Sequence, residues 1–297
     1  MNMEPRQPSR GLPPWRERIG FAGLGLITLV VVLPVIWIFG YIFLNGIGVI
    51  SWDFISQPPR NRGLEGGILS PLVGTAWLMA GTIIFSLPIG VLAAIYLTEY
   101  APQNWLTRLI NLSIVNLAGV PSIVYGMFGV GLFVIALGSF TGGSSILSAS
   151  LTLACQALAM VITSSREALL TVPFSYREAS LGLGATKLQT IRHIVVPQAV
   201  PGILTGVILA VGRAAGETAP ILAIGAAFTL PRLPTSPFDN FMALPYHLFI
   251  ISEQVPEMPG ERKWATALVL LAVVLVFNAA SFIIRTRIRL KQKALGG

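Results

Sequence analysis

The sequence predicts an all-α, polytopic membrane protein with six transmembrane helices. Of its 297 residues, 54% are hydrophobic and only 11% are charged, whereas about a quarter of the residues in a soluble domain are charged. Several apolar runs exceed the roughly 18 residues that suffice for a transmembrane helix. These runs are continuously apolar, whereas the strands of a membrane β-barrel alternate between apolar and polar residues. The chain is therefore expected to cross the membrane as helices.

The expected spans are apolar runs that end at charged or turn-forming residues. The 57 residues between Arg108 and Arg166 carry no formal charge. One helix of that length would measure about 85 Å, far more than a hydrocarbon core of about 30 Å. We therefore expect the chain to turn back at the Gly- and Ser-rich segment 138–145. The six expected spans are residues 19–46, 69–97, 109–137, 146–165, 199–225 and 264–284.

The first span is interpreted as a transmembrane helix of the mature protein and not as a cleaved secretion signal. Four arginines precede it, as basic residues precede the apolar core of a secretion signal. However, the run from Ile19 to Gly48 is longer than such a core, and no clear cleavage site follows it. Residues 1–68 are thus expected to form a cytoplasmic tail, a first span and an external loop, added to a transmembrane domain at 69–284.

The distribution of Lys and Arg predicts that both termini are cytoplasmic. In that orientation, fourteen of these residues fall in cytoplasmic segments and five in external segments, as the positive-inside rule requires. Topology therefore explains the net charge of +8 without a nucleic-acid partner. The basic tail 285–297 is expected to lie against anionic headgroups. The external segment 226–263 is either a docking surface for a partner or a plain connector, and its Leu244–Val255 part is expected to be a short interfacial helix.

Signatures of catalysis and of metal binding are missing from the sequence. It contains neither the glycine-rich phosphate loop of nucleotide hydrolases nor the paired histidines of zinc proteases. Cys155 is the single cysteine, and His193 and His247 fall on opposite sides of the membrane in the expected topology. We therefore expect no catalytic residue, no metal site and no cofactor on this chain.

The cytoplasmic segment 166–196 is expected to be a contact surface. Leu181, Leu188, Ile191 and Val195 fall on one helical stripe. Two glycines, at 182 and 184, weaken a continuous helix and predict two short helices that meet at a turn. Such an element suits either a helix-in-groove contact with a soluble partner or a position on the membrane surface.

The same segment resembles the EAA loop of binding-protein-dependent ABC importer permeases. The resemblance rests on Glu178-Ala179-Ser180, Gly184, Ile194 and Val196-Pro197 at the family spacing, with Ser180 in place of Ala and Val196 in place of Leu. It implies a type I ABC importer permease fold in which the loop at 166–197 enters a cleft of an ATPase subunit. The implied coupling residues are Glu178, Ala179, Ser180, Gly184, Ile194 and Pro197.

Two charges inside the fifth span point to a substrate path. A helix that entered the membrane near Val200 would carry Arg213 about 20 Å along its axis, where a charge costs about 2.5–3.5 kcal/mol. Glu217 follows at i+4 on the same expected face and partly neutralises the arginine. Residues 202, 206, 210 and 214 are Gly or Ala, a stripe that allows close helix packing. A structural ion pair is the alternative to a path.

The strings Gly212–Pro220 and Gly119–Gly126 resemble the PstA family of phosphate importer permeases. This resemblance implies that Arg213, Glu217 and Thr218 line a phosphate pathway in the bacterial inner membrane. The implied partners are a PstC-like second permease, a PstB-like ATPase dimer that holds ATP and Mg, and an external PstS-like phosphate-binding protein. Pro121 and Pro220 are candidate hinges of a gated path, or simply tolerated membrane prolines.

Three alternatives remain open at this point. A permease for another oxyanion, such as sulfate or molybdate, would keep the same cytoplasmic loop. A membrane-embedded enzyme would need several catalytic groups at one depth, and the sequence offers only two intramembrane charges. A stand-alone channel or secondary carrier would function without an ATPase.

Overall fold

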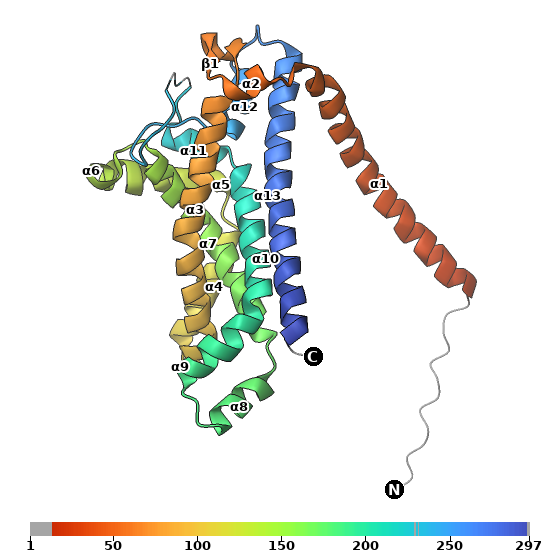
Figure 1. The fold of residues 1–297 in the computed structure, drawn as a ribbon, viewed down its shortest axis with the longest axis vertical. Coiled ribbons are helices and arrows are strands. Elements are labelled where there is room, and N and C mark those ends of the chain that lie inside the picture. The colour runs from red at the N-terminus through yellow and green to blue at the C-terminus, as the bar shows by residue number, and fades with distance from the viewer. Residues whose placement is uncertain (1–13, 229, 231, 296–297) are drawn as a thin grey trace.

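The computed structural model describes residues 14–228, 230 and 232–295, and most of these are helical (Figure 1). Within these ranges, five helices are long and apolar enough to span a membrane, and a bent helix pair makes a sixth when it is counted as one span. The all-α membrane fold is confirmed. Arg6 and Arg10, which contribute to the expected charge asymmetry, lie outside the described residues.

Three long helices form the centre of the bundle. They are α3 (Leu69–Ile95), α7 (Ile146–Leu170) and α10 (Val196–Ala215). Their shared core is aliphatic and includes the fully buried Val161 and Val195. The π-helical turn η3 (Tyr96–Tyr100) extends α3.

Small residues let α10 approach α7 closely. Gly202 faces the Cβ atom of Ala168, and a side chain at Gly206 would overlap the side chain of Ser164. Ala210, one turn further along, is 2% exposed. The predicted stripe of small residues is therefore a helix–helix contact, in which absent Cβ atoms permit close backbone packing.

The expected third span is a bent helix pair. Helix α4 (Trp105–Ala118) and helix α5 (Ser122–Gly129), which continues as the π-helix η4 (Val130–Ala136), meet at an angle of 106°. Pro121 stands at the break. Its ring disfavours a helical conformation for the preceding residue, and it has no N–H to donate. The single span expected at 109–137 is thus interrupted, and a short helix, α6 (Gly138–Thr141), ends this part of the chain.

One end of the bundle is closed by two segments, residues 47–66 before α3 and residues 219–253 after α10 (Figure 1). A two-residue antiparallel hairpin pairs Pro59 with Gly66. The helix expected at Leu244–Val255 is confirmed as α12, although Leu244 and Ile250 are buried against the bundle rather than lying along an interface. The elements at this end are η1 (Ile47–Val49), α2 (Trp52–Ser56), β1 (Pro59–Arg60), η2 (Asn61–Gly63), β2 (Glu65–Gly66), α11 (Ala219–Ile224) and α12 (Leu244–Glu253).

The first and last helices lie at the periphery. Helix α1 (Pro14–Gly46) packs against α13 (Gly260–Leu295) near its own C-terminal end, where the Tyr41 ring contacts the Trp264 ring edge-on at 5.2 Å. Toward its N-terminus α1 diverges from the bundle (Figure 1). Helix α13 continues without a break to Leu295, so the basic tail expected at 285–297 extends the last helix as far as the structure describes it.

The opposite end of the bundle carries the predicted pair of short helices. They are α8 (Phe174–Gly182) and α9 (Lys187–Thr190), and a π-helical turn, η5 (Ile191–Val195), joins α9 to α10 (Figure 1). The turn and the first short helix are confirmed, whereas α9 is the first turn of the long helix Lys187–Ala215. Because α7 runs to Leu170 and the next long helix begins at Lys187, the connecting segment is shorter than the expected 166–196.

Candidate functional site

The predicted ion pair forms at a break between two helices. Arg213 Nε donates to Glu217 Oε1 at 3.2 Å. Helix α10 ends at Ala215, and Glu217 stands in the link before α11. The expectation that both charges lie on one continuous helix is therefore wrong in detail. The pair forms because the chain remains helix-like just beyond Ala215, with the Glu217 N–H donating to the Ala214 carbonyl.

Glu217 is held from two sides, whereas Arg213 faces open space. Gln156 on α7 donates from Nε2 to Glu217 Oε1 at 2.6 Å. The Glu217 side chain is 13% exposed, and the Arg213 side chain is 56% exposed. The carboxylate is thus a fixed anchor, and its guanidinium partner keeps donors free for a further ligand.

Arg213 forms part of the wall of a cavity of about 370 Å³. The cavity lies between α10, α7 and the bend from α4 to α5. The Tyr125 hydroxyl, at this bend, donates to the Leu117 carbonyl at 2.8 Å. The remaining N–H donors of Arg213 can hold a small oxyanion at this wall through charge-assisted hydrogen bonds. The polar residues that line it are Tyr125, Gln156, Thr163, Ser164, Glu167 and Arg213.

The two candidate hinge prolines lie at two helix breaks. Pro121 precedes α5, and Pro220 stands in the first turn of α11, where a missing N–H is tolerated. The two short helices pack together, since a Cβ atom on Gly126 of α5 would lie 2.9 Å from the Pro220 Cα atom. Thr218 precedes α11 as its N-cap residue. Both prolines thus begin short helices rather than kinking long ones, and their part in gating remains a prediction.

The predicted coupling residues lie on and after the two short helices at the α8 end of the bundle. Glu178 and Ala179 are exposed on α8, and Gly184 has φ +83° in the turn before α9. Ser180 and Thr190 share a hydrogen bond of 2.9 Å between their hydroxyls, which ties α8 to α9. Ile194 and Pro197 follow where the chain enters α10.

The predicted apolar stripe of this segment divides into two parts. Ile191 and Val195 are buried in the bundle, at 4% and 0% exposure. Leu181 and Leu188 are 48% and 65% exposed, and Leu183 is 90% exposed. Exposed leucines on this protruding segment suit a contact with another protein or with the membrane surface, the two alternatives that the sequence left open.

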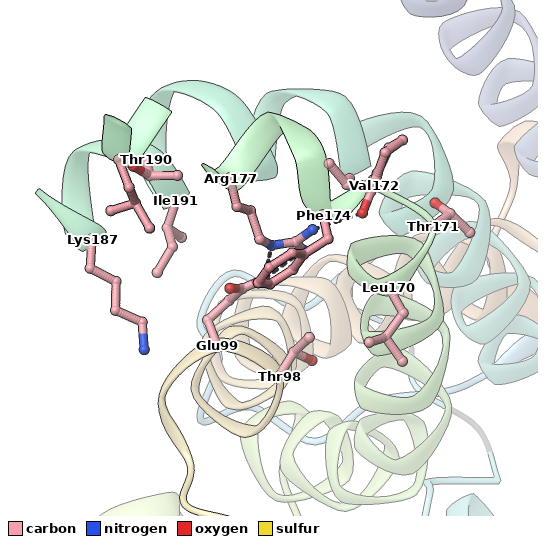
Figure 2. A pocket seen from close by; sticks show the side chains of 12 residues that line it. Thr98, Glu99, Leu170, Thr171, Val172, Phe174, Arg177, Lys187, Thr190 and Ile191 are labelled. Atoms are coloured by element: carbon pink, nitrogen blue, oxygen red, sulfur yellow. Dashed lines mark hydrogen bonds and ion pairs between the residues drawn. The ribbon is translucent and has the colours of Figure 1, made fainter. Parts of the chain in front are cut away.

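A buried ion pair that the sequence did not indicate anchors α8 to the bundle. Arg177 on α8 donates to Glu99 Oε1 at 2.8 Å, and the two side chains are 12% and 9% exposed (Figure 2). Arg177 also donates to the carbonyls of Val172 and Leu169. A cavity of about 660 Å³ adjoins the pair. The only signal in the sequence was a Glu at the end of an apolar run. The pairing itself could not be predicted, because no spacing rule relates residues 78 positions apart.

Metal ligands and the single cysteine are the remaining groups with possible chemistry. Among the residues that the structure describes, no group of three or more His, Cys, Asp or Glu side chains is placed to hold a metal ion. Cys155 is half-buried on α7.

Three permeases of known description are similar to this chain in sequence over most of its length. A permease of Bacillus subtilis, described as the probable ABC transporter permease protein YqgI, is 32% identical over 89% of this chain and 93% of its own length. The phosphate transport system permease protein PstA 1 of Mycobacterium tuberculosis is 32% identical over 86% of this chain and 84% of its own. The probable PstA of Methanocaldococcus jannaschii is 29% identical over 93% of this chain and 96% of its own.

Solved structures share the fold. A chain of a bacterial ABC transporter that imports the polysaccharide alginate superposes with a TM-score of 0.64 at 14% identity, over 92% of this chain and 96% of that one. A chain of the inward-facing methionine transporter MetNI superposes with a TM-score of 0.60 at 19% identity, over 74% and 97%. Residues 86–293 match the model of one family. The chain belongs to the binding-protein-dependent transport system inner membrane component family, and it is a multi-pass membrane permease of the kind found in ABC importers.

Proposed function

We propose that this chain is the permease subunit of an ATP-driven importer of inorganic phosphate and forms half of the translocation path. The named PstA relatives support phosphate as the substrate. The observation that carries the proposal is the Arg213 side chain, 56% exposed at the wall of this cavity and paired with a fixed carboxylate.

The chemistry of the pair suits passage rather than storage. A guanidinium offers paired N–H donors that match phosphate oxygens. In a low dielectric an isolated arginine would hold an anion strongly. A site on a transport path must bind the anion weakly enough for the anion to dissociate. Glu217, at 3.2 Å, reduces the net positive potential at Arg213. Thr218 completes the proposed path residues at the start of α11.

Coupling to ATP hydrolysis is assigned to the exposed short helices. In this proposal Glu178, Ala179, Ser180 and Gly184 enter a cleft of an ATPase subunit, and Ile194 and Pro197 transmit its closure to α10. The chain itself then catalyses no reaction and holds no cofactor, since ATP and Mg belong to the ATPase. Family membership supports an ATPase and an external binding protein as partners.

The finer assignments follow from the phosphate proposal. The partners would be a PstC-like second permease, a PstB-like ATPase dimer and a PstS-like phosphate-binding protein. The protein would lie in the bacterial inner membrane with α8 and both termini on the cytoplasmic side. The hairpin end, with Arg60 and α12, would then face the binding protein.

The test is uptake of radioactive phosphate by cells or proteoliposomes that contain the whole importer. Arg213→Gln and Glu217→Gln should each lower uptake at least tenfold while the complex still assembles. The first removes the guanidinium that binds phosphate, and the second removes the carboxylate that weakens this binding enough for release. Arg287→Gln, a change at an exposed arginine on α13, is the matched control. Normal phosphate uptake by both path variants would make the pair structural. Sulfate uptake without phosphate uptake would assign the permease to another oxyanion.

A further inference from the structure

A third cavity, lined mostly by polar residues, lies at the end of the bundle that carries α8. It measures about 430 Å³ and is bounded by the end of α3 with η3, the link to α4, the first turns of α4, and α7. It shares no lining residue with the cavity at Arg213. It is therefore a separate site, and its interpretation does not depend on the transported substrate.

The cavity is positively charged. Arg108 of α4 and Arg166 of α7 both line it, and none of the described residues around it is Asp or Glu. The two nearest carboxylates along the chain are directed elsewhere. Glu99 pairs with Arg177, and Glu167 lines the other cavity. Two cations in one recess repel each other unless an anion lies between them.

Arg166 has an unused donor in this recess. Its Nη1 donates to Asn111 Oδ1 at 2.7 Å. Its Nε atom is buried and has no hydrogen-bond partner in the described part of the chain. A buried donor of a charged group that lacks an acceptor is destabilising, so a ligand that accepts this bond would stabilise the folded protein.

Thr98, which lines this cavity and also the 660 Å³ cavity beside the Glu99–Arg177 pair, carries a second unused group. Thr98 Oγ1 is buried and makes no hydrogen bond to any residue that the structure describes. Thr98 lies in the π-helical turn η3, a geometry that is frequent at functional sites. Helix α4 also begins at this cavity, with Asn104 as its N-cap, and its positive dipole end favours an anion.

We propose that this cavity binds a phosphate group between Arg108 and Arg166, with the Arg166 Nε–H and the Thr98 hydroxyl as donors. Guanidinium groups and a hydroxyl match the several acceptor oxygens of a tetrahedral oxyanion. The group has two possible sources, inorganic phosphate in solution or the headgroup of an anionic phospholipid, since basic pockets between membrane helices bind such headgroups.

The experiment uses the complete importer purified from membranes, with Arg213→Gln in this chain so that the first cavity does not contribute. One arm transfers the complex into nanodiscs of phosphatidylcholine alone and titrates inorganic phosphate, with thermal stability as the readout. The other arm adds phosphatidylglycerol without free phosphate and counts retained lipid by native mass spectrometry. Stabilisation in the first arm that Arg166→Gln and Arg108→Gln reduce identifies free phosphate as the ligand of this cavity, because a phosphate-binding protein in the complex would respond equally in all variants. Retention in the second arm identifies a lipid headgroup.

Three variants test the site in whichever arm responds. Arg166→Gln and Arg108→Gln should each weaken binding about tenfold or more, because each removes a charge-assisted hydrogen bond. Thr98→Val should weaken binding without lowering the stability of the ligand-free complex, since that hydroxyl has no acceptor within the described chain. Arg287→Gln is the control and should leave binding unchanged. No response in either arm, or equal binding by all three variants and wild type, would overturn the proposal.

Discussion

Replacing Glu99 by Gln tests whether the buried ion pair fixes α8 in place. The Arg177 side chain is 12% exposed in the structure, and the change leaves its guanidinium without an anionic partner. Breaking a buried pair in this way costs about 3–5 kcal/mol. Arg177 keeps its hydrogen bonds to the carbonyls of Val172 and Leu169, so we expect the lower end, about 3 kcal/mol. The strain falls on α8 because this short helix is the element that Arg177 anchors.

Hydrogen exchange and transport stoichiometry measure the effect in the whole importer. Backbone amides of Phe174–Gly182 should exchange on the order of 100-fold faster in Glu99→Gln, as an opening cost of about 3 kcal/mol requires. Phosphate transported per ATP hydrolysed should fall, since a loosened α8 transmits ATPase closure poorly.

A double variant and a control complete this experiment. Adding Arg177→Met to Glu99→Gln removes the unpaired charge and should restore part of the lost protection. Glu65→Gln, at an exposed acid in β2, should change neither readout. If Glu99→Gln leaves both the exchange of α8 and the transport stoichiometry at wild-type values, the ion pair does not anchor the helix.

Three further predictions concern the turn before α9, the hairpin end and the α7–α10 contact. Gly184→Ala should destabilise the turn by about 1 kcal/mol and impair coupling, because Gly184 has φ +83°; Gly182→Ala, where the added Cβ meets nothing within 4 Å, is the control and should be neutral in the same uptake assay. Burial, and then the charge of Arg262, lower the pKa of His247 from 6.5 to about 4. Protonation therefore favours the unfolded state, and stability should fall by up to about 3 kcal/mol as the pH drops from about 6.5 toward 4; His247→Phe should reduce this pH dependence of the thermal midpoint, and an unchanged dependence would contradict the assignment. Gly206→Val should destabilise the complex by about 1–3 kcal/mol and so lower its thermal midpoint, because the valine side chain would overlap Ser164. An unaltered midpoint would show that α7 and α10 do not need close contact at this position.

The sequence predicts the long helices well because length and apolarity alone decide them. The first, second, fourth, fifth and last spans all correspond to long apolar helices. The third does not, since hydropathy registers apolar residues and not the direction of the chain. Pro121 was recognised as a possible kink, but the 106° bend between α4 and α5 depends on what packs on either side of it.

The candidate site could be predicted in part from the sequence. Arg213 and Glu217 stood out because charges are rare within apolar runs, and they do pair. The contact of Gln156 with Glu217 was not predictable, since a polar residue in an apolar run carries no sign of its partner. The same limit hid Glu99 and Arg177, which tertiary packing brings together.

The central claim is tested most directly by phosphate uptake into proteoliposomes that contain this chain, a second permease, an ATPase and a phosphate-binding protein. The account predicts that phosphate accumulates only when ATP and every component are present, and that sulfate does not accumulate. Phosphate flux through this chain alone, or undiminished accumulation after the ATPase is omitted, would contradict it.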